Sequence, residues 1–144
     1  MIGQAGVSVT GRTPNGSGAS VAGVIGRIDE VVVDCAEPLA LAEFWAAVLG
    51  GEARMRDADW CYVDPPGWTR LAFQRVPEGK STKNRLHLDV EVDDITIAIA
   101  AAVALGAVAV GEQHHAIAGS FQVLLDPEGN EWCVVRSAAP SHHA

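Results

Sequence analysis

The sequence predicts an α+β domain built from two βαβββ modules, which form a curved mixed sheet around a cleft. The same landmarks occur twice in the same order: a strand, a helix that ends in Leu-Gly, and an Asp-Pro-x-Gly turn before a last strand. The Leu-Gly pairs are 49–50 and 105–106, and the turns are 64–67 and 126–129. This order indicates an internal repeat of about 55 residues.

The first module begins with β-branched residues over 28–33, which predict a strand with Glu30 on one face. Pro38 is favourable in the first turn of the following helix, and Gly50 ends it. Apolar residues at helical spacing predict one buried stripe, formed by Leu41, Phe44, Trp45, Val48 and Leu49. Further strands are predicted over 52–56, 60–63 and 71–76.

The second module begins with a strand over 85–91 that alternates strictly. One face is apolar (Leu86, Leu88 and Val90), and the other is polar (Arg85, His87, Asp89 and Glu91). Asp93-Asp94 start the second helix, because acidic residues are favourable at the positive end of the helix dipole. Strands follow over 107–110, 121–125 and 131–136.

Each sheet is expected to carry its helix on one face and to turn the other face toward the cleft. Gly50 follows Glu30 by 20 positions, and Gly106 follows His87 by 19. Glu30 and His87 therefore occupy nearly equivalent places in the two opening strands. The repeat predicts that they meet in the cleft.

The expected boundaries follow composition. Residues 1–26 are rich in Gly, Ser, Thr and Ala and are expected to form a flexible arm. A single domain is expected over 27–137, with modules 27–77 and 84–137, and residues 138–144 form a tail.

Composition limits the partners. The net charge of −8 argues against nucleic acid, although an acidic excess serves solubility first of all. No apolar run approaches the roughly 20 residues of a membrane span, so no membrane partner is expected. Cys35, Cys61 and Cys133 are odd in number and form no CxxC motif, which favours a reducing cytoplasmic location.

Four aromatic residues are candidates for binding a flat or apolar small molecule in the cleft. Trp60 and Tyr62 alternate onto one face of their strand, and Phe73 and Phe121 lie on other predicted strands. The alternative is that all four belong to the core.

Three blocks of residues, 34–50, 85–94 and 125–135, carry a family resemblance. Examples are Phe-Trp-Ala-Ala-Val-Leu-Gly in the first block and Asp-Pro-Glu-Gly-Asn in the third. The arrangement resembles the vicinal oxygen chelate superfamily, and within it the glyoxalase-like proteins related to glyoxalase I, bleomycin-resistance proteins and extradiol dioxygenases. The resemblance covers about residues 27–136 and implies a glyoxalase-like fold.

The resemblance implies a metal site with one ligand on the first and last strand of each module. Carried over by position, these places fall on Glu30, Gln74, His87 and Cys133, with Glu131 as a substitute for Cys133. Only His87 is a usual ligand of the family at its place. Zn²⁺ is the most compatible metal for such donors. The alternative is an empty site, with Glu30 hydrogen-bonded to His87 and Cys133 acting as a small buried hydrophobe.

For function, the resemblance implies a lyase or isomerase that abstracts a proton beside a carbonyl group, with Glu30 as general base and His87 beside it. The alternative is a metal-free protein that binds an antibiotic or metabolite, and a scaffold or dimerisation module also remains open. An extradiol dioxygenase needs two His ligands, whereas His114, His115, His142 and His143 are expected on the surface. The resemblance also implies a homodimer.

Overall fold

The computed structural model of the chain describes residues 23–138. The first module contains β1 (Glu30–Cys35), α1 (Pro38–Leu49), β2 (Arg54–Asp57), β3 (Trp60–Val63) and β4 (Arg70–Arg75). The second contains β5 (Asp89–Glu91), α2 (Ile95–Ala104), β6 (Val108–Ala116), β7 (Gly119–Leu125) and β8 (Glu131–Ser137). This succession confirms the predicted α+β architecture.

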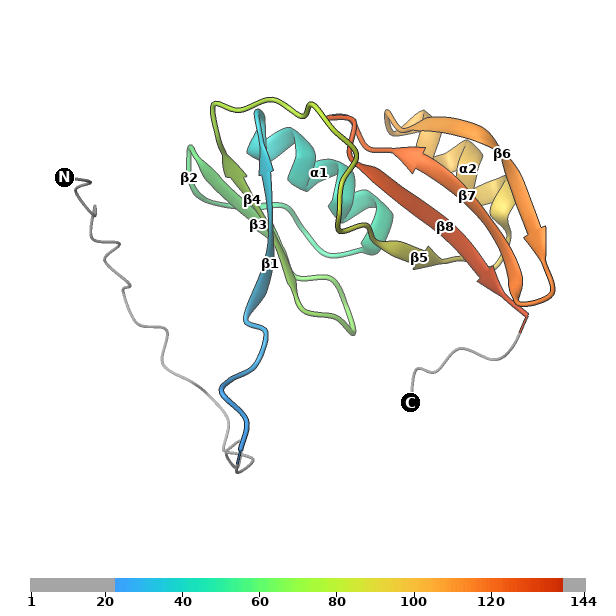
Figure 1. Ribbon diagram of the computed structural model, residues 1–144. Helices are drawn as coiled ribbons and strands as arrows, with labels where there is room; N and C mark the ends of the chain where they lie inside the picture. Colours follow the sequence, from blue (N-terminus) through green and yellow to red (C-terminus); the bar gives the residue numbers. More distant parts are fainter. Residues whose placement is uncertain (1–22, 139–144) are drawn as a thin grey trace.

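The two sheets have the same topology, with strand orders β1-β4-β3-β2 and β5-β8-β7-β6. In each sheet the opening strand pairs in parallel with the last strand of its module. The remaining pairs are antiparallel. Figure 1 shows the two sheets side by side, with α1 between them and α2 behind the second sheet. The repeat predicted from the landmarks is therefore a repeat of structure.

Aromatic side chains join the two modules into one core. The rings of Phe44 and Trp45 on α1 lie edge-on to Trp132 on β8, with centroids 6.0 and 5.1 Å from it. These three residues are almost fully buried and belong to one cluster with apolar side chains of both sheets. The helix predicted from its apolar stripe therefore packs on its own sheet and also against the other module.

The turn between β7 and β8 adds polar contacts across the same boundary. The buried carboxyl group of Asp126 accepts hydrogen bonds from Trp45 Nε1 at 3.3 Å and from the backbone N–H groups of Glu128 and Asn130. The carboxylate of Glu128 accepts the backbone N–H groups of Ala36 at 2.6 Å and Glu37 at 3.0 Å. Glu128 thus caps the start of α1, which has no side-chain cap of its own.

Two predicted elements differ in extent. Strand β5 has three residues rather than the seven predicted: residues 85–88 lie outside the strand, although Leu88 O still accepts a hydrogen bond from Cys133 N on β8. Strand β6 continues through His114 and His115, which were expected in a linker. Both histidines are exposed, as expected. Polar residues are tolerated here because β6 is an edge strand and this part of it is exposed to solvent.

The structure does not describe most of the two predicted terminal segments. Outside the described residues lie 1–22 of the arm and 139–144 of the tail, which include His142 and His143. None of the helices formed by residues 23–138 is long and apolar enough to cross a membrane.

Candidate functional site

The face of the second sheet that points away from α2, here called the open face, brings several chemically active side chains together. Asp89 on β5 and Cys133 on β8 are direct partners in the parallel ladder, so their side chains emerge on the same face. His87 precedes Asp89 by two residues and lies on this face as well. The alternation predicted from the sequence therefore holds for these side chains, even though His87 lies just outside the strand.

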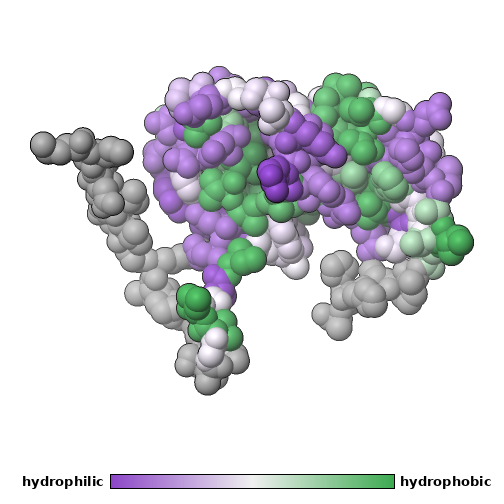
Figure 2. Space-filling view, in the orientation of Figure 1, coloured by the Kyte–Doolittle hydropathy of each residue, from purple (hydrophilic) through white to green (hydrophobic). Residues whose placement is uncertain are grey.

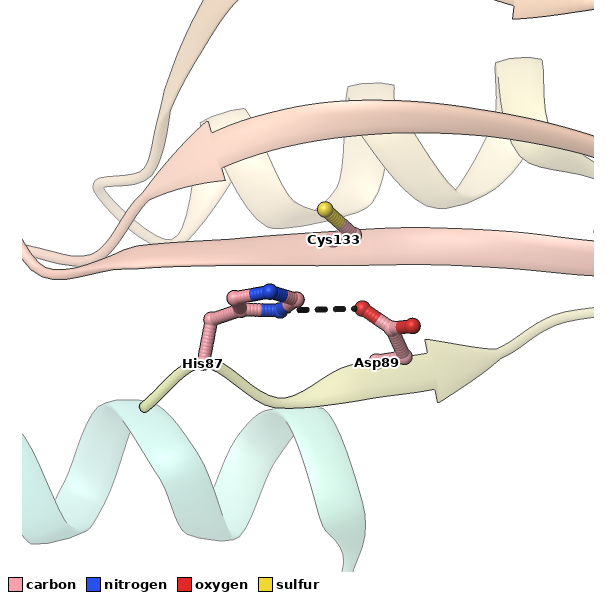
Figure 3. A group of neighbouring side chains, drawn as sticks. All are labelled: His87, Asp89 and Cys133. Carbon is pink, nitrogen blue, oxygen red and sulfur yellow. Dashed lines mark ion pairs between the residues drawn. The ribbon is translucent and has the colours of Figure 1, made fainter. Parts of the chain in front are cut away.

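His87, Asp89 and Cys133 form a compact group. Their donor atoms all lie within 4.8 Å of one another, and His87 Nδ1 is 3.3 Å from Asp89 Oδ1. Figure 3 shows the imidazole and the carboxylate rising from one segment, with the thiol on the neighbouring strand. The side chains of His87 and Asp89 are 51% and 55% exposed, so solvent and solutes reach them.

Burial raises the pKa of the Cys133 thiol, and the nearby negative charge of Asp89 raises it further. The thiol is therefore protonated at neutral pH when no cation is bound. In that state Cys133 is a weak nucleophile, because the thiolate is the reactive form.

A pocket of about 460 Å³ opens over this group. His87, Asp89 and Cys133 line its polar side, and Phe121 and Val135 contribute apolar lining. Figure 2 shows apolar patches over the part of the molecule that contains β6, β7 and β8. The pocket therefore combines a few polar groups with an apolar floor, as small-molecule sites commonly do.

Glu30 and Gln74 lie on the corresponding face of the first sheet, which points away from α1 and is called its open face. Glu30 pairs with Arg70 in the β1–β4 ladder, and Gln74 pairs with Asp34 four residues further on. Neither residue lines the pocket over His87 or belongs to the group of donors there. Within one chain, the structure thus brings together His87 and Cys133 from the four residues implied by the resemblance, and leaves Glu30 and Gln74 apart.

Trp60 and Tyr62 share that face of the first sheet, and arginine side chains cover them. The guanidinium of Arg70 lies 3.9 Å from the centre of the Tyr62 ring, and that of Arg56 lies 5.1 Å from the Trp60 ring. Arg70 also donates two hydrogen bonds to Asp64, at 2.8 and 2.9 Å. The hydrogen bonds that Arg70 donates to Asp64 raise the pKa of Arg70, and the nearby negative charges of Asp64 and Glu30 raise it further.

The two predicted phenylalanines have different surroundings. Phe121 is 37% exposed and lines the pocket, whereas Phe73 is 0% exposed and belongs to the hydrophobic core. Successive residues of a strand point to opposite faces, so Phe73 cannot share the open face with its neighbour Gln74. Phe73 therefore has no surface to offer a ligand.

Glu131, the predicted substitute for Cys133, has other partners. Its carboxylate accepts the backbone N–H of Asn84 at 2.9 Å and binds Lys80 Nζ at 3.0 Å. These contacts lower the pKa of Glu131 from 4.5 to about 2, with the hydrogen bond from Asn84 as the largest cause. Glu131 thus secures the linker between the modules.

The residue that the sequence reasoning missed is Asp89. Its signal was present in the alternation of 85–91, which placed Asp89 on the same face as His87. The position of Asp89 is not one of the four implied by the family resemblance, so it was not chosen as a site residue.

The donors of this pocket fit a divalent transition metal. Imidazole nitrogen, carboxylate oxygen and thiolate sulfur are all ligands that Zn²⁺ accepts, and a thiolate disfavours Mg²⁺ and Mn²⁺. The two half-exposed side chains have room to adjust around an ion. His87, Asp89 and Cys133 are therefore the residues that would hold a metal within one chain.

Two repeated βαβββ modules with a ligand-sized pocket on an open sheet face define the fold of the vicinal oxygen chelate superfamily. A profile of the family described as glyoxalase-like domain matches residues 30–135. The chain belongs to this family. The family match and the fold confirm the resemblance seen in the sequence.

Solved structures show the same fold. A glyoxalase/bleomycin resistance protein/dioxygenase family enzyme from Burkholderia phytofirmans PsJN is 18% identical, with a TM-score of 0.65 over 76% of this chain and 97% of that one. A glyoxalase-related enzyme from Fulvimarina pelagi is 15% identical, with a TM-score of 0.63 over 82% and 94%. The oxidase ChaP-H2 is 20% identical, with a TM-score of 0.61 over 82% and 98%. No curated protein shows significant sequence similarity to the chain.

Proposed function

We propose that the chain binds a small organic carbonyl compound in the pocket on the open face of its second sheet and acts on it as a lyase or isomerase. The observation that carries this proposal is the pairing of His87 with Asp89, 3.3 Å apart at the edge of a pocket with an apolar floor. A carboxylate beside an imidazole can fix the orientation of the ring. Such a pair can act as a general base that accepts a proton from a bound ligand.

The pocket gives each side chain a distinct task. Phe121 and Val135 offer apolar contacts that hold the body of the ligand, and an aromatic ring suits a flat molecule. The His87–Asp89 pair would take the proton from the carbon next to the carbonyl group. A divalent metal, when bound by the pocket's donors, would polarise that carbonyl and stabilise negative charge on its oxygen. Because the metal would then occupy the donor atoms of His87 and Asp89, the proton would go to a carboxylate outside the donor set, such as Glu30.

Hydrogen–deuterium exchange tests the chemistry without a known product. Small 2-oxo and 2-hydroxycarbonyl compounds are incubated with the protein in D₂O, and loss of the proton next to the carbonyl group is followed by NMR. We expect exchange above the buffer rate that falls by about 100-fold or more in His87→Ala and Asp89→Asn. Glu91→Gln is the matched control, because Glu91 lies two residues further along β5 and outside the pocket. Equal exchange in all variants would contradict the assignment.

A second candidate function is binding without turnover, as in a resistance or sequestering protein. The observation that favours it is the half-exposed state of His87 and Asp89, since a catalytic pair is commonly shielded from water. Ligand-induced chemical shifts at Phe121 and Val135, without any exchange or product, would support this function over the first.

The role predicted for Glu30 as general base requires a second chain, because Glu30 lies on the first sheet beside Arg70. We therefore include a homodimer in the proposal, with the first sheet of one copy placed over the pocket of the other. Light scattering should give twice the mass of the chain. Glu30→Gln should then slow proton exchange, whereas a monomeric mass with full exchange in Glu30→Gln would remove Glu30 from the mechanism.

A further inference from the structure

We propose that His87, Asp89 and Cys133 bind one zinc-type metal ion, in a centre that the second module builds alone and in which Asp89 takes the place of the two ligands expected from the first module. The inference deepens the proposed function and rests on it only for the pocket. Metal binding is measured without any organic ligand, so each proposal can fail by itself.

The backbone places these donors without help from the first module. Asp89 and Cys133 face each other directly across β5 and β8, and Cys133 N donates a hydrogen bond to Leu88 O at 2.9 Å. This hydrogen bond holds Leu88, which lies between His87 and Asp89, against β8. The ladder thus holds the backbone at Asp89 and Cys133, and His87 directly precedes the hydrogen-bonded Leu88.

The distances are close to those of a metal centre. Ligand atoms around a tetrahedral Zn²⁺ lie about 3.3–3.7 Å apart, given bond lengths of about 2.0–2.3 Å. Here the three donor atoms lie within 4.8 Å of one another, and the imidazole and carboxylate are already at 3.3 Å. A closure of about 1 Å at half-exposed side chains completes the geometry. Three protein ligands leave a fourth position open for water or substrate, as in catalytic zinc sites.

The donor set also distinguishes this centre from the one implied by the resemblance. Glu30 and Gln74 do not line the pocket, and Glu131 is engaged by Lys80 and Asn84. Among the residues of 23–138, His87, Asp89 and Cys133 form the group of metal-binding side chains found within mutual reach. Of the four ligands implied by the resemblance, His87 and Cys133 therefore remain, and Asp89 joins them from β5.

Cobalt(II) titration of the metal-free full-length protein tests this centre, because Co²⁺ reports thiolate ligation and coordination geometry by its absorption. We expect one Co²⁺ per chain, a sulfur-to-cobalt band in the near ultraviolet and strong visible bands typical of tetrahedral coordination. Stoichiometric displacement by Zn²⁺ should follow, with no displacement by Mg²⁺ at the same concentration.

The variants separate ligands from neighbours. Cys133→Ser should abolish the near-ultraviolet band. His87→Ala and Asp89→Asn should each weaken binding by more than the ~10–100-fold that loss of a mere hydrogen-bond partner of a ligand costs. Glu91→Gln is the matched carboxylate control, because Glu91 lies on the same strand as Asp89 but outside the pocket, and it should leave affinity and spectrum unchanged. All are expected to fold, since the replaced groups are partly or largely exposed, and thermal unfolding verifies this.

Several outcomes would overturn the proposal. Asp89→Asn with an unchanged spectrum and binding weakened by no more than about 100-fold would make Asp89 an orienting partner of His87 instead of a ligand. An equal loss in Glu30→Gln would restore the four-residue site that the resemblance implies. Binding that survives in Cys133→Ser/His87→Ala but disappears in His142→Ala/His143→Ala would assign the ion to the tail.

Discussion

Asp126 and Asp64 occupy the same place in the two Asp-Pro turns, but their surroundings differ. Asp126 is 3% exposed and accepts hydrogen bonds from Trp45, Glu128 and Asn130. The side chain of Asp64 is 56% exposed and binds Arg70 within its own module. The turn at 126–129 therefore contains a buried carboxylate that accepts several hydrogen bonds. The turn at 64–67 contains an ion pair near the surface.

Asp126→Ala should lower the free energy of unfolding by about 3 kcal/mol, because it leaves buried donors without an acceptor. The matched change Asp64→Ala should cost less, about 1 kcal/mol, because the carboxylate of Asp64 is exposed and water can take its place beside the largely buried Arg70 guanidinium. Urea unfolding followed by tryptophan fluorescence measures both. Equal losses would show that Asp126 contributes no more than a surface contact.

Glu131 gives stability a defined dependence on pH. Its pKa is lowered from 4.5 to about 2 in the folded chain, so folding favours the charged form. The resulting stabilisation is present above about pH 4.5 and is lost as the pH falls toward 2. Glu131→Gln should therefore be less stable than the natural chain by about 1 kcal/mol at pH 7.

The difference between Glu131→Gln and the natural chain should shrink below pH 4.5 and vanish near pH 2, as measured by urea unfolding at a series of pH values. A difference that stays constant from pH 7 to pH 3 would mean that the charge of Glu131 is not what stabilises the linker.

At the scale of elements, α1 depends on a residue of the other module for its first turn. The carboxylate of Glu128 binds the N–H groups of Ala36 and Glu37, where the positive end of the helix dipole lies. Glu128→Ala should destabilise the chain by about 1 kcal/mol, the usual cost of a lost cap.

Glu128→Gln serves as the control, because it keeps an acceptor oxygen and removes the charge. Its loss should be about half as large and should depend less on salt concentration. A loss in Glu128→Gln as large as that in Glu128→Ala would mean that charge alone accounts for the cap.

The strength of local patterns explains what could be predicted. The apolar stripe of α1 and the turns at 64–67 and 126–129 depend on residues close in the chain, so their positions were predictable. The alternation of 85–91 correctly assigned His87 and Asp89 to one face, because side-chain direction has a period of two. The extension of β6 through His114 was not predictable, since an exposed edge strand has no apolar face to mark it.

At the scale of the whole molecule, the separation of Glu30 from His87 could not be read from the sequence. Glu30 on β1 and His87 just before β5 both lie on the predicted face, but the relative position of the two sheets depends on tertiary contacts. Trp45 with Asp126, and Glu128 with the start of α1, set this position. The periodicity of a strand carries no information about such contacts. The repeat could therefore indicate that Glu30 and His87 have equivalent places in the two modules, but not whether their side chains lie close together.

Trp132 lies at the centre of the shared core and is 1% exposed, yet its Nε1 is buried without a hydrogen-bond partner. Trp132→Phe should therefore cost less than about 1.5 kcal/mol, since it removes an unpaired donor along with some packing. Trp132→Ala should cost about 3–5 kcal/mol because it leaves a cavity between the modules.

Denaturant unfolding monitored by far-ultraviolet circular dichroism distinguishes these variants. Both should keep a single transition, because the two modules share one core. Two separate transitions in Trp132→Ala would show that each module holds its fold without the other.

The linker over residues 77–84 has a further consequence for assembly. It lies between the modules, is largely exposed, and touches the second module through Lys80 and Asn84. Cleavage of the chain between Pro77 and Gly79 would give two fragments. The first carries Trp45 and the second carries Trp132, and these two side chains contact each other in the intact chain. Each fragment alone should be mostly unfolded, and mixing should restore native circular dichroism. If the fragments reassemble, the two halves could be fused to two other proteins. Refolding of the halves would then show that the two fused proteins bind each other.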